Sequence, residues 1–179
     1  MRPAPGQSTC TAMICGECRE VLARWRLWRR EALRPPRAFP FLYCMIWQAR
    51  HHRIEFPRRP LVMGIVNIND DSFCGDGTLD PDKALAQAAQ MLRDGADIID
   101  IGAESARTNR GPITVAEEVT RLMPFLKSWP KLVAAFAIAP WDAEQVWPPV
   151  LSINTWRSEV IAAVLPHGGD LINDISALP

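Results

Sequence analysis

The sequence has no run of about 18 apolar residues, the length that a helix needs to cross a membrane. Its first residues, 1–5, also lack the apolar stretch of a secretory signal. A transit peptide is usually rich in serine, whereas Ser8 is the only serine before residue 60. We therefore expect a cytoplasmic protein without a membrane partner.

Cysteine is scattered, with five residues at positions 10, 15, 18, 44 and 74, and this odd number suggests no disulfide framework. Cys15 and Cys18 form a CxxC motif, which zinc sites and redox pairs both use. A zinc site needs four ligands, and no second CxxC or HxxxH motif follows at a usable distance. Free thiols in a reducing compartment are the favoured interpretation.

Lysine and aspartate are absent from residues 1–60, which contain 12 arginines and 4 glutamates. Residues 61–179 hold 8 basic and 16 acidic side chains, so the overall net charge of zero hides two opposite halves. Such a split indicates two regions with different roles. We separate an Arg-rich extension, residues 1–45, from a domain at residues 46–179.

The extension contains one candidate helix, at residues 17–33, with Trp25 and Trp28 three positions apart and Pro35 ending it. A basic helix with tryptophans can lie on nucleic acid or on a membrane surface. Arginine without lysine, beside proline and cysteine, is also the composition that results when a GC-rich DNA region upstream of a gene is translated. We favour this second interpretation, a non-functional or mis-started extension. No nucleic-acid partner is therefore expected.

From Trp47 onward, the spacing of apolar residues predicts strands that alternate with helices. Pro81 suits a first helical turn, Gly95 suits a helix end, and Thr114 with Glu117 forms a capping box. Residues 128–148 are expected to be irregular. The expected strands are 61–67, 97–102, 151–154 and 170–175, and the expected helices are 81–93, 114–127 and 157–165.

The expected strands are nearly all apolar, which is typical of buried strands in parallel βαβ units. Polar residues cluster at their carboxyl ends, the edge where (β/α)8 barrels place their active sites. A doubly wound sheet is the alternative, but no GxGxxG motif follows any strand. We expect the first four βα units of a (β/α)8 barrel. The polar residues are Asn67, Asp100, Glu104, Asn154, Asn173 and Asp174.

Four motifs at these strand ends resemble the signatures of the dihydropteroate synthase family. Residues 63–73 resemble MGI(L/V)NVTPDSF, and residues 95–107 resemble GADIIDIGGESTRP. Residues 152–155 resemble S(I/V)DT, and residues 168–175 resemble GA-x-IINDI. Residues 46–179 therefore resemble the N-terminal half of a pterin-binding barrel.

The resemblance implies a transferase of folate biosynthesis. Such enzymes join 6-hydroxymethyl-7,8-dihydropterin pyrophosphate to p-aminobenzoate, release pyrophosphate and usually need Mg²⁺. The leaving group needs hydrogen-bond donors and positive charge, and the pterin needs a flat pocket with paired donors and acceptors. The implied partners are these small molecules, and the resemblance leaves room for a homodimer of the full-length protein.

The resemblance also implies roles for individual residues. Asn67 matches the asparagine that meets the metal and the pyrophosphate, and its alternative role is to form a turn. Asp71 and Arg107 match residues of the two mobile loops and are the expected catalytic residues. The alternative for Arg107 is a solvated surface arginine without a role in the site. The expected substrate-binding residues are Asn67, Ser72, Phe73, Arg107, Asn154 and Asn173.

Several positions depart from the family pattern. Asn69-Asp70 replaces Thr-Pro, and Ala106 lacks the hydroxyl of the family threonine. Asn154 replaces an aspartate that accepts hydrogen bonds from the pterin, and losing that charge-assisted bond would cost about 1–3 kcal/mol. The alternative function is a pterin-binding paralogue that is non-catalytic or has an altered specificity. Corrinoid methyltransferases share the barrel but lack the DSF and ESxR loops that are present here.

Length is the largest departure, since a complete barrel takes about 250 residues. Neither a Ser-x-Lys nor an Arg-x-His motif occurs between residues 61 and 179, and the family carries these on later strands. We expect the 179-residue chain to be an N-terminal fragment that is inactive alone. Pairing with another half-barrel is the alternative.

Overall fold

The computed structural model describes residues 45–56, 58–70, 75–104, 111–136 and 144–176. Residues Tyr43–Pro179 form one compact unit, which contains all the elements described below. The helix expected at residues 17–33 lies outside the described residues.

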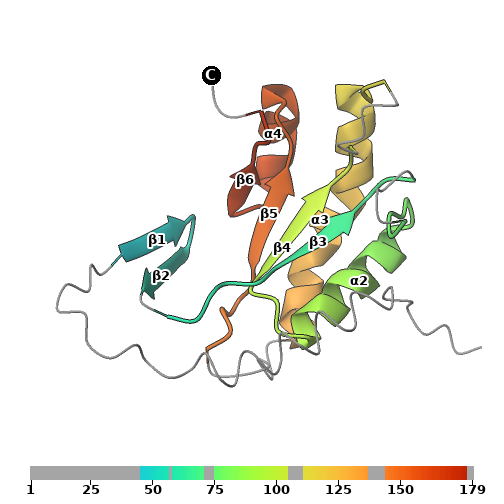
Figure 1. Cartoon of the computed structure of the whole chain (residues 1–179). Coiled ribbons are helices and arrows are strands. Elements are labelled where there is room, and N and C mark those ends of the chain that lie inside the picture. Colours follow the sequence, from blue (N-terminus) through green and yellow to red (C-terminus); the bar gives the residue numbers. More distant parts are fainter. Residues whose placement is uncertain (1–44, 57, 71–74, 105–110, 137–143, 177–179) are drawn as a thin grey trace, which may run out of the picture. The chain divides into compact units, whose positions relative to one another are not determined.

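Four parallel strands form one sheet in the order β3, β4, β5, β6 (Figure 1). All four lie where the sequence predicts strands, so the expected parallel βαβ arrangement is confirmed. A strand order without reversal is typical of a (β/α)8 barrel and not of a doubly wound sheet. The strands are β3 (Met63–Asn67), β4 (Ile98–Gly102), β5 (Val150–Asn154) and β6 (Leu171–Asn173).

Helices cover one face of this sheet (Figure 1). They are α2 (Pro81–Arg93), α3 (Val115–Phe136) and α4 (Ser158–Val164), with a 3-10 turn, Leu165–His167, after α4. Every second strand residue faces the helices, so the core forms between the two layers. None of the helices within the described ranges is long and apolar enough to cross a membrane. The fully buried core includes Val66, Ile99, Ile101, Leu122, Phe125, Leu126, Ile153 and Val160.

The boundaries of α2 follow from its sequence. Asp80 is the N-cap, and its carboxylate accepts hydrogen bonds from the backbone N–H groups of Asp82 and Lys83. Pro81 occupies the first turn, as predicted, where its missing N–H costs nothing. Gly95 follows the helix with φ +97°, a left-handed conformation that glycine adopts without strain. The predicted start and end of this helix are confirmed.

Helix α3 corrects one prediction. The threonine half of the capping box is confirmed, because Thr114 Oγ1 accepts a hydrogen bond from the backbone N–H of Glu117, while the Glu117 carboxylate accepts one from Arg121. The helix continues to Phe136, however, through Pro124 and Pro130 and into the stretch that was expected to be irregular. Its apolar stripe extends past Leu126 to Trp129, which stacks on Phe125, so burial outweighs the two missing donors.

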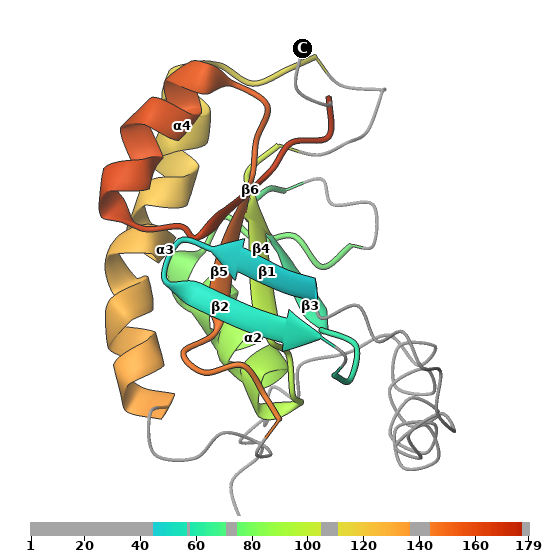
Figure 2. The same cartoon turned by 90° about the vertical axis from the view of Figure 1, so that its left-hand side faces the viewer.

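A hairpin of β1 (Met45–Ala49) and β2 (His52–Phe56) is an element that the sequence patterns did not predict. Figure 2 views the sheet from the side of this hairpin. Ala49 and Ile54 are buried in a small apolar cluster with Ile98 and Val150, which lie at the amino ends of their strands. The hairpin therefore covers the amino-terminal end of the sheet face that points away from the helices.

The same sheet face is open further along β3. Met63 is 44% exposed and Ile65 is 49% exposed, whereas Val66, on the helix side, is fully buried. Within the described part of the chain, the expectation that β3 is a buried strand therefore holds for its helix side and not for its open face. In a complete barrel this face would line the interior, where strands from the other half would cover it.

Candidate functional site

One row of side chains crosses the carboxyl end of the sheet on its open face. The strand register aligns Asn67 with Gly102, Gly102 with Asn154, and Asn154 with Asn173. We call these four residues the rim row. The structure thus brings together Asn67, Asn154 and Asn173, three of the residues that sequence reasoning selected.

Gly102 leaves the gap in the rim row between Asn67 and Asn154. A methyl group at Gly102 would lie 3.3 Å from Cβ of Asn154, which is tighter than ordinary contact. The absence of a side chain at Gly102 therefore gives the Asn154 amide room. A position without a side chain, with an amide further along the row on each side, suits a flat polar ligand.

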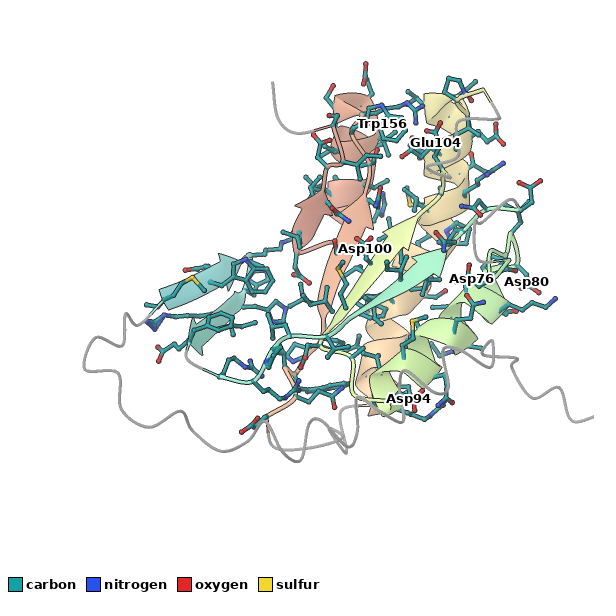
Figure 3. The ribbon with its side chains drawn as sticks, in the orientation of Figure 1. Asp76, Asp80, Asp94, Asp100, Glu104 and Trp156 are labelled. Atoms are coloured by element: carbon teal, nitrogen blue, oxygen red, sulfur yellow. The ribbon has the colours of Figure 1, made fainter. Side chains whose placement is uncertain are left out.

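Asp100 lies below the rim row, in the middle of β4 (Figure 3). It is 1% exposed, and its Oδ1 accepts a hydrogen bond of 2.5 Å from the Ser152 hydroxyl. Its Oδ2 accepts a hydrogen bond of 3.1 Å from Nδ2 of Asn173. The sequence placed Asp100 at a strand end and gave it no role. Asp100 stands two residues before Gly102 on β4, and this spacing is the signal in the sequence that both residues face the same side of the sheet.

Asn67 begins the rim row, and its Nδ2 donates a hydrogen bond of 3.2 Å to Oδ1 of Asp76. Since an ionised carboxylate only accepts, the amide oxygen of Asn67 is left for another partner. Mg²⁺ takes oxygen ligands and often keeps only one or two from the protein, with phosphates and waters completing its shell. Asn67 and Asp76 fit that demand. The described residues, this place included, contain no group of three His, Cys, Asp or Glu side chains that could hold a metal ion.

Arg157 is a second residue that sequence reasoning missed. Its Nη1 lies 2.5 Å from Oε2 of Glu104 and also donates to Glu118, whose side chain is fully buried. The guanidinium lies over the Trp156 ring, 4.6 Å from its centroid. Figure 3 shows Glu104 and Trp156 at the carboxyl end of the sheet. Glu104 follows β4 and Arg157 follows β5, and since these strands are neighbours, their following segments had to adjoin.

The hydrogen bond to Glu104 raises the pKa of Arg157, burial lowers it, and the hydrogen bond to Glu118 raises it again. The net effect is a rise, so the guanidinium keeps its charge. Glu104 also accepts a hydrogen bond of 3.3 Å at Oε1 from the backbone N–H of Ile113. Glu104 therefore ties together the two ends of the segment that carries Arg107.

The remaining site predictions fall outside the described residues: Asp71, Ser72, Phe73 and Arg107. Their expected roles stay predictions. Asp174, which follows β6, accepts hydrogen bonds of 2.7 Å from the backbone N–H and the hydroxyl of Ser176.

Four consecutive parallel strands joined by three helices, with polar groups along their carboxyl edge, define part of a (β/α)8 barrel, and the same fold is found in similar proteins of known structure. Residues 63–179 match the family model described as pterin binding enzyme. The chain belongs to this family, which confirms the resemblance of its four motifs.

Individual relatives support this family assignment. The chain is 36% identical over 136 residues to dihydropteroate synthase of Neisseria meningitidis serogroup C, covering 74% of this chain and 42% of that protein. It is 38% identical over 125 residues to the mitochondrial folate synthesis bifunctional protein of Pisum sativum, covering 69% of this chain and 22% of that protein. The crystal structure of Burkholderia cenocepacia dihydropteroate synthase complexed with 7,8-dihydropteroate matches with a TM-score of 0.56 and 32% identity, covering 75% of this chain and 39% of that one. The chain thus spans less than half the length of each of these proteins.

Proposed function

We propose that this chain carries the pterin-binding part of a dihydropteroate synthase, a transferase of folate biosynthesis. The reaction joins 6-hydroxymethyl-7,8-dihydropterin pyrophosphate to p-aminobenzoate and releases pyrophosphate. The observation that carries the proposal is the rim row, in which Asn67, Gly102, Asn154 and Asn173 align across the four strands, with the buried Asp100 hydrogen-bonded to Asn173. The relatives named as dihydropteroate synthases, and the one bound to dihydropteroate, support it.

The chemistry of the rim row suits a pterin. The amide edge of a pterin alternates donors and acceptors, and an asparagine amide offers both kinds of group. The absence of a side chain at Gly102 would let the ring approach β4 between Asn67 and Asn154. We propose that Asn154 and Asn173 bind the pterin edge, and that Ser72, Phe73 and Arg107 complete the substrate site.

Mg²⁺ belongs to this proposal. Asn67 and Asp76 would hold it through side-chain oxygens, and the ion would neutralise the developing charge of the pyrophosphate when bound. Asp71 and Arg107 keep their predicted catalytic roles, with the fixed guanidinium of Arg107 suited to an anionic ligand. The cytoplasmic location and a homodimer of the full-length protein also stay predictions.

We expect the 179-residue chain to bind the pterin pyrophosphate with Mg²⁺ but not to condense it with p-aminobenzoate. The pyrophosphate leaving group needs positive charge. Among the described residues next to the rim row, the nearest cation in the sequence is Arg157, which follows β5, and its guanidinium already pairs with Glu104 and Glu118. Titration calorimetry measures the binding, and radiolabelled p-aminobenzoate measures turnover. Absence of binding would contradict the proposed function, whereas turnover would contradict only the predicted inactivity.

Asn154 favours one alternative, a pterin-binding paralogue with altered specificity. An aspartate at this position can accept charge-assisted hydrogen bonds from the pterin, which an amide cannot. For a synthase site, Asn154→Asp should therefore tighten pterin binding by about 1–3 kcal/mol, roughly 5- to 150-fold. Calorimetry of both chains with the same pterin pyrophosphate measures the difference. Weaker binding after the substitution would favour the paralogue, because it would show that the site requires an amide.

A further inference from the structure

Asp100 faces the rim row from below, yet the proposed reaction gives it no task. Its carboxylate is 1% exposed and accepts hydrogen bonds from two neutral donors, the hydroxyl of Ser152 and the amide of Asn173. Within the described ranges, no lysine, arginine or histidine forms an ion pair with it. A buried carboxylate without a cation is costly, which is a reason to look for its function.

The chemistry of these groups dictates how the Asn173 side chain is turned. An ionised carboxylate has no proton to donate, so only the NH₂ end of the amide can face Asp100. The hydrogen bond of 3.1 Å from Nδ2 of Asn173 to Oδ2 of Asp100 has this sense. The carbonyl oxygen of Asn173 must then point away from Asp100. Position 173 of the rim row is therefore an acceptor.

Ser152 fixes the other half of the carboxylate. Its hydroxyl donates a hydrogen bond of 2.5 Å to Oδ1 of Asp100, and both side chains are buried. Asp100 and Ser152 are partners in the register of β4 and β5, so the strands themselves hold the pair in place. The carboxylate is thus held from one side by Ser152 and turns the Asn173 amide on the other.

We propose that Asp100 is a positioning residue that sets the hydrogen-bonding sense of Asn173 and thereby selects ligands with a donor at that point. This inference rests on the proposed pterin function. A pterin carries an exocyclic amino group, which donates, whereas lumazine carries an oxo group, which accepts, at the same position. The carbonyl oxygen of Asn173 would pair with the amino group and repel the oxo group.

The test compares the two ligands on the full 179-residue chain. The unaltered chain should bind pterin at least about tenfold more tightly than lumazine, because a wrong partner covers the carbonyl oxygen of Asn173 without donating a hydrogen bond to it. In Asp100→Asn, an amide replaces the carboxylate and no longer dictates the sense of Asn173, so the ratio should fall to roughly threefold or less. Fluorescence titration of each ligand yields the two dissociation constants.

The exchange variant Asp100→Asn with Asn173→Asp separates positioning from a merely structural role. It restores one carboxylate and one amide with their places swapped, so position 173 again presents an acceptor. The preference for pterin should return to at least about tenfold. Ser152→Ala is the matched control, since it removes a hydrogen bond to Asp100 without freeing Asn173, and it should keep the preference. If the exchange variant discriminates no better than Asp100→Asn, positioning by Asp100 is contradicted.

A measurement on the unaltered chain serves if the variants do not fold. The side-chain amide protons of Asn173, assigned by their loss in Asn173→Ser, should exchange slowly in the free chain. They should also shift little when pterin binds, because they point at Asp100. A large shift on binding would overturn the inference. If the unaltered chain binds neither ligand, the proposed pterin function fails as well; if it binds pterin and Asp100→Asn keeps the preference, only the inference fails.

Discussion

Replacing Asp97 with alanine is expected to lower the free energy of unfolding by about 3–5 kcal/mol, because the change removes the buried carboxylate that a buried arginine contacts with two hydrogen bonds. Asp97 is fully buried and accepts hydrogen bonds of 2.7 and 2.9 Å from the guanidinium of Arg59, whose side chain is 4% exposed. It also accepts 2.9 Å hydrogen bonds from the backbone N–H groups of Val62 and Val146. One carboxylate thus ties together the segments that lead into β3, β4 and β5.

Thermal unfolding followed by circular dichroism measures this effect, and a loss of this size corresponds to a fall in Tm of roughly 10 °C. Asp82→Ala is the matched control, because Asp82 is exposed in the first turn of α2 and its charge is worth about 1 kcal/mol at most. If both variants lose the same free energy of unfolding, the buried hydrogen bonds of Asp97 contribute no more to stability than an exposed charge does.

Replacing Arg157 with methionine is the second large effect, again about 3–5 kcal/mol of unfolding free energy. The substitution keeps an apolar stem but leaves two carboxylates without their shared cation. Glu118 is fully buried and Glu104 is 11% exposed, so water cannot replace the guanidinium. Urea denaturation of the two chains measures the loss.

The double variant Arg157→Met with Glu118→Gln separates the charge from the packing. Removing the stranded charge should recover more than about 1 kcal/mol of the loss, whereas a pure packing defect would not respond. Lys83→Met is the control for an exposed pair: Lys83 and Asp80 lie 4.0 Å apart with exposed side chains, and the expected loss is about 0.5 kcal/mol or less.

The pH dependence of this cluster has a defined sign. The pKa of Arg157 is raised in the folded chain, so the stabilisation is fully present below the unfolded pKa and is lost only as the pH rises through the folded value. The pH range in which this stabilisation is lost lies above any ordinary working pH. The titration of Arg157 therefore adds no pH dependence to the free energy of unfolding near neutrality.

Much of the fold could be predicted because it depends on local patterns. Apolar spacing, Pro81, Gly95 and the Thr114 cap act within a few residues, so the four parallel strands and the start of each helix follow from them, whereas the hairpin of β1 and β2 does not. The far end of α3 could not be predicted, because it depends on what Trp129 packs against. Two prolines inside the helix are tolerated only because the sheet and neighbouring helices bury that stripe.

The candidate site divides in the same way. The positions of Asn67, Asn154 and Asn173 follow from the rule that parallel strands align their carboxyl ends. The roles of Asp100 and Arg157 do not, since each depends on partners that are 39 to 73 residues away in the sequence.

The sequence by itself determined the alternation of strands and helices, the family, and which residues stand at the strand ends. All of these depend on short motifs and on the periodic spacing of apolar residues. Only the tertiary structure decided that Asp100 lies beneath Asn173, that Arg157 joins Glu104 to Glu118, and that Asp97 binds three segments at the opposite end of the sheet. The physical reason is register. Strand pairing determines which side chains of distant segments meet, and a shift of one residue would turn each of them to the other face.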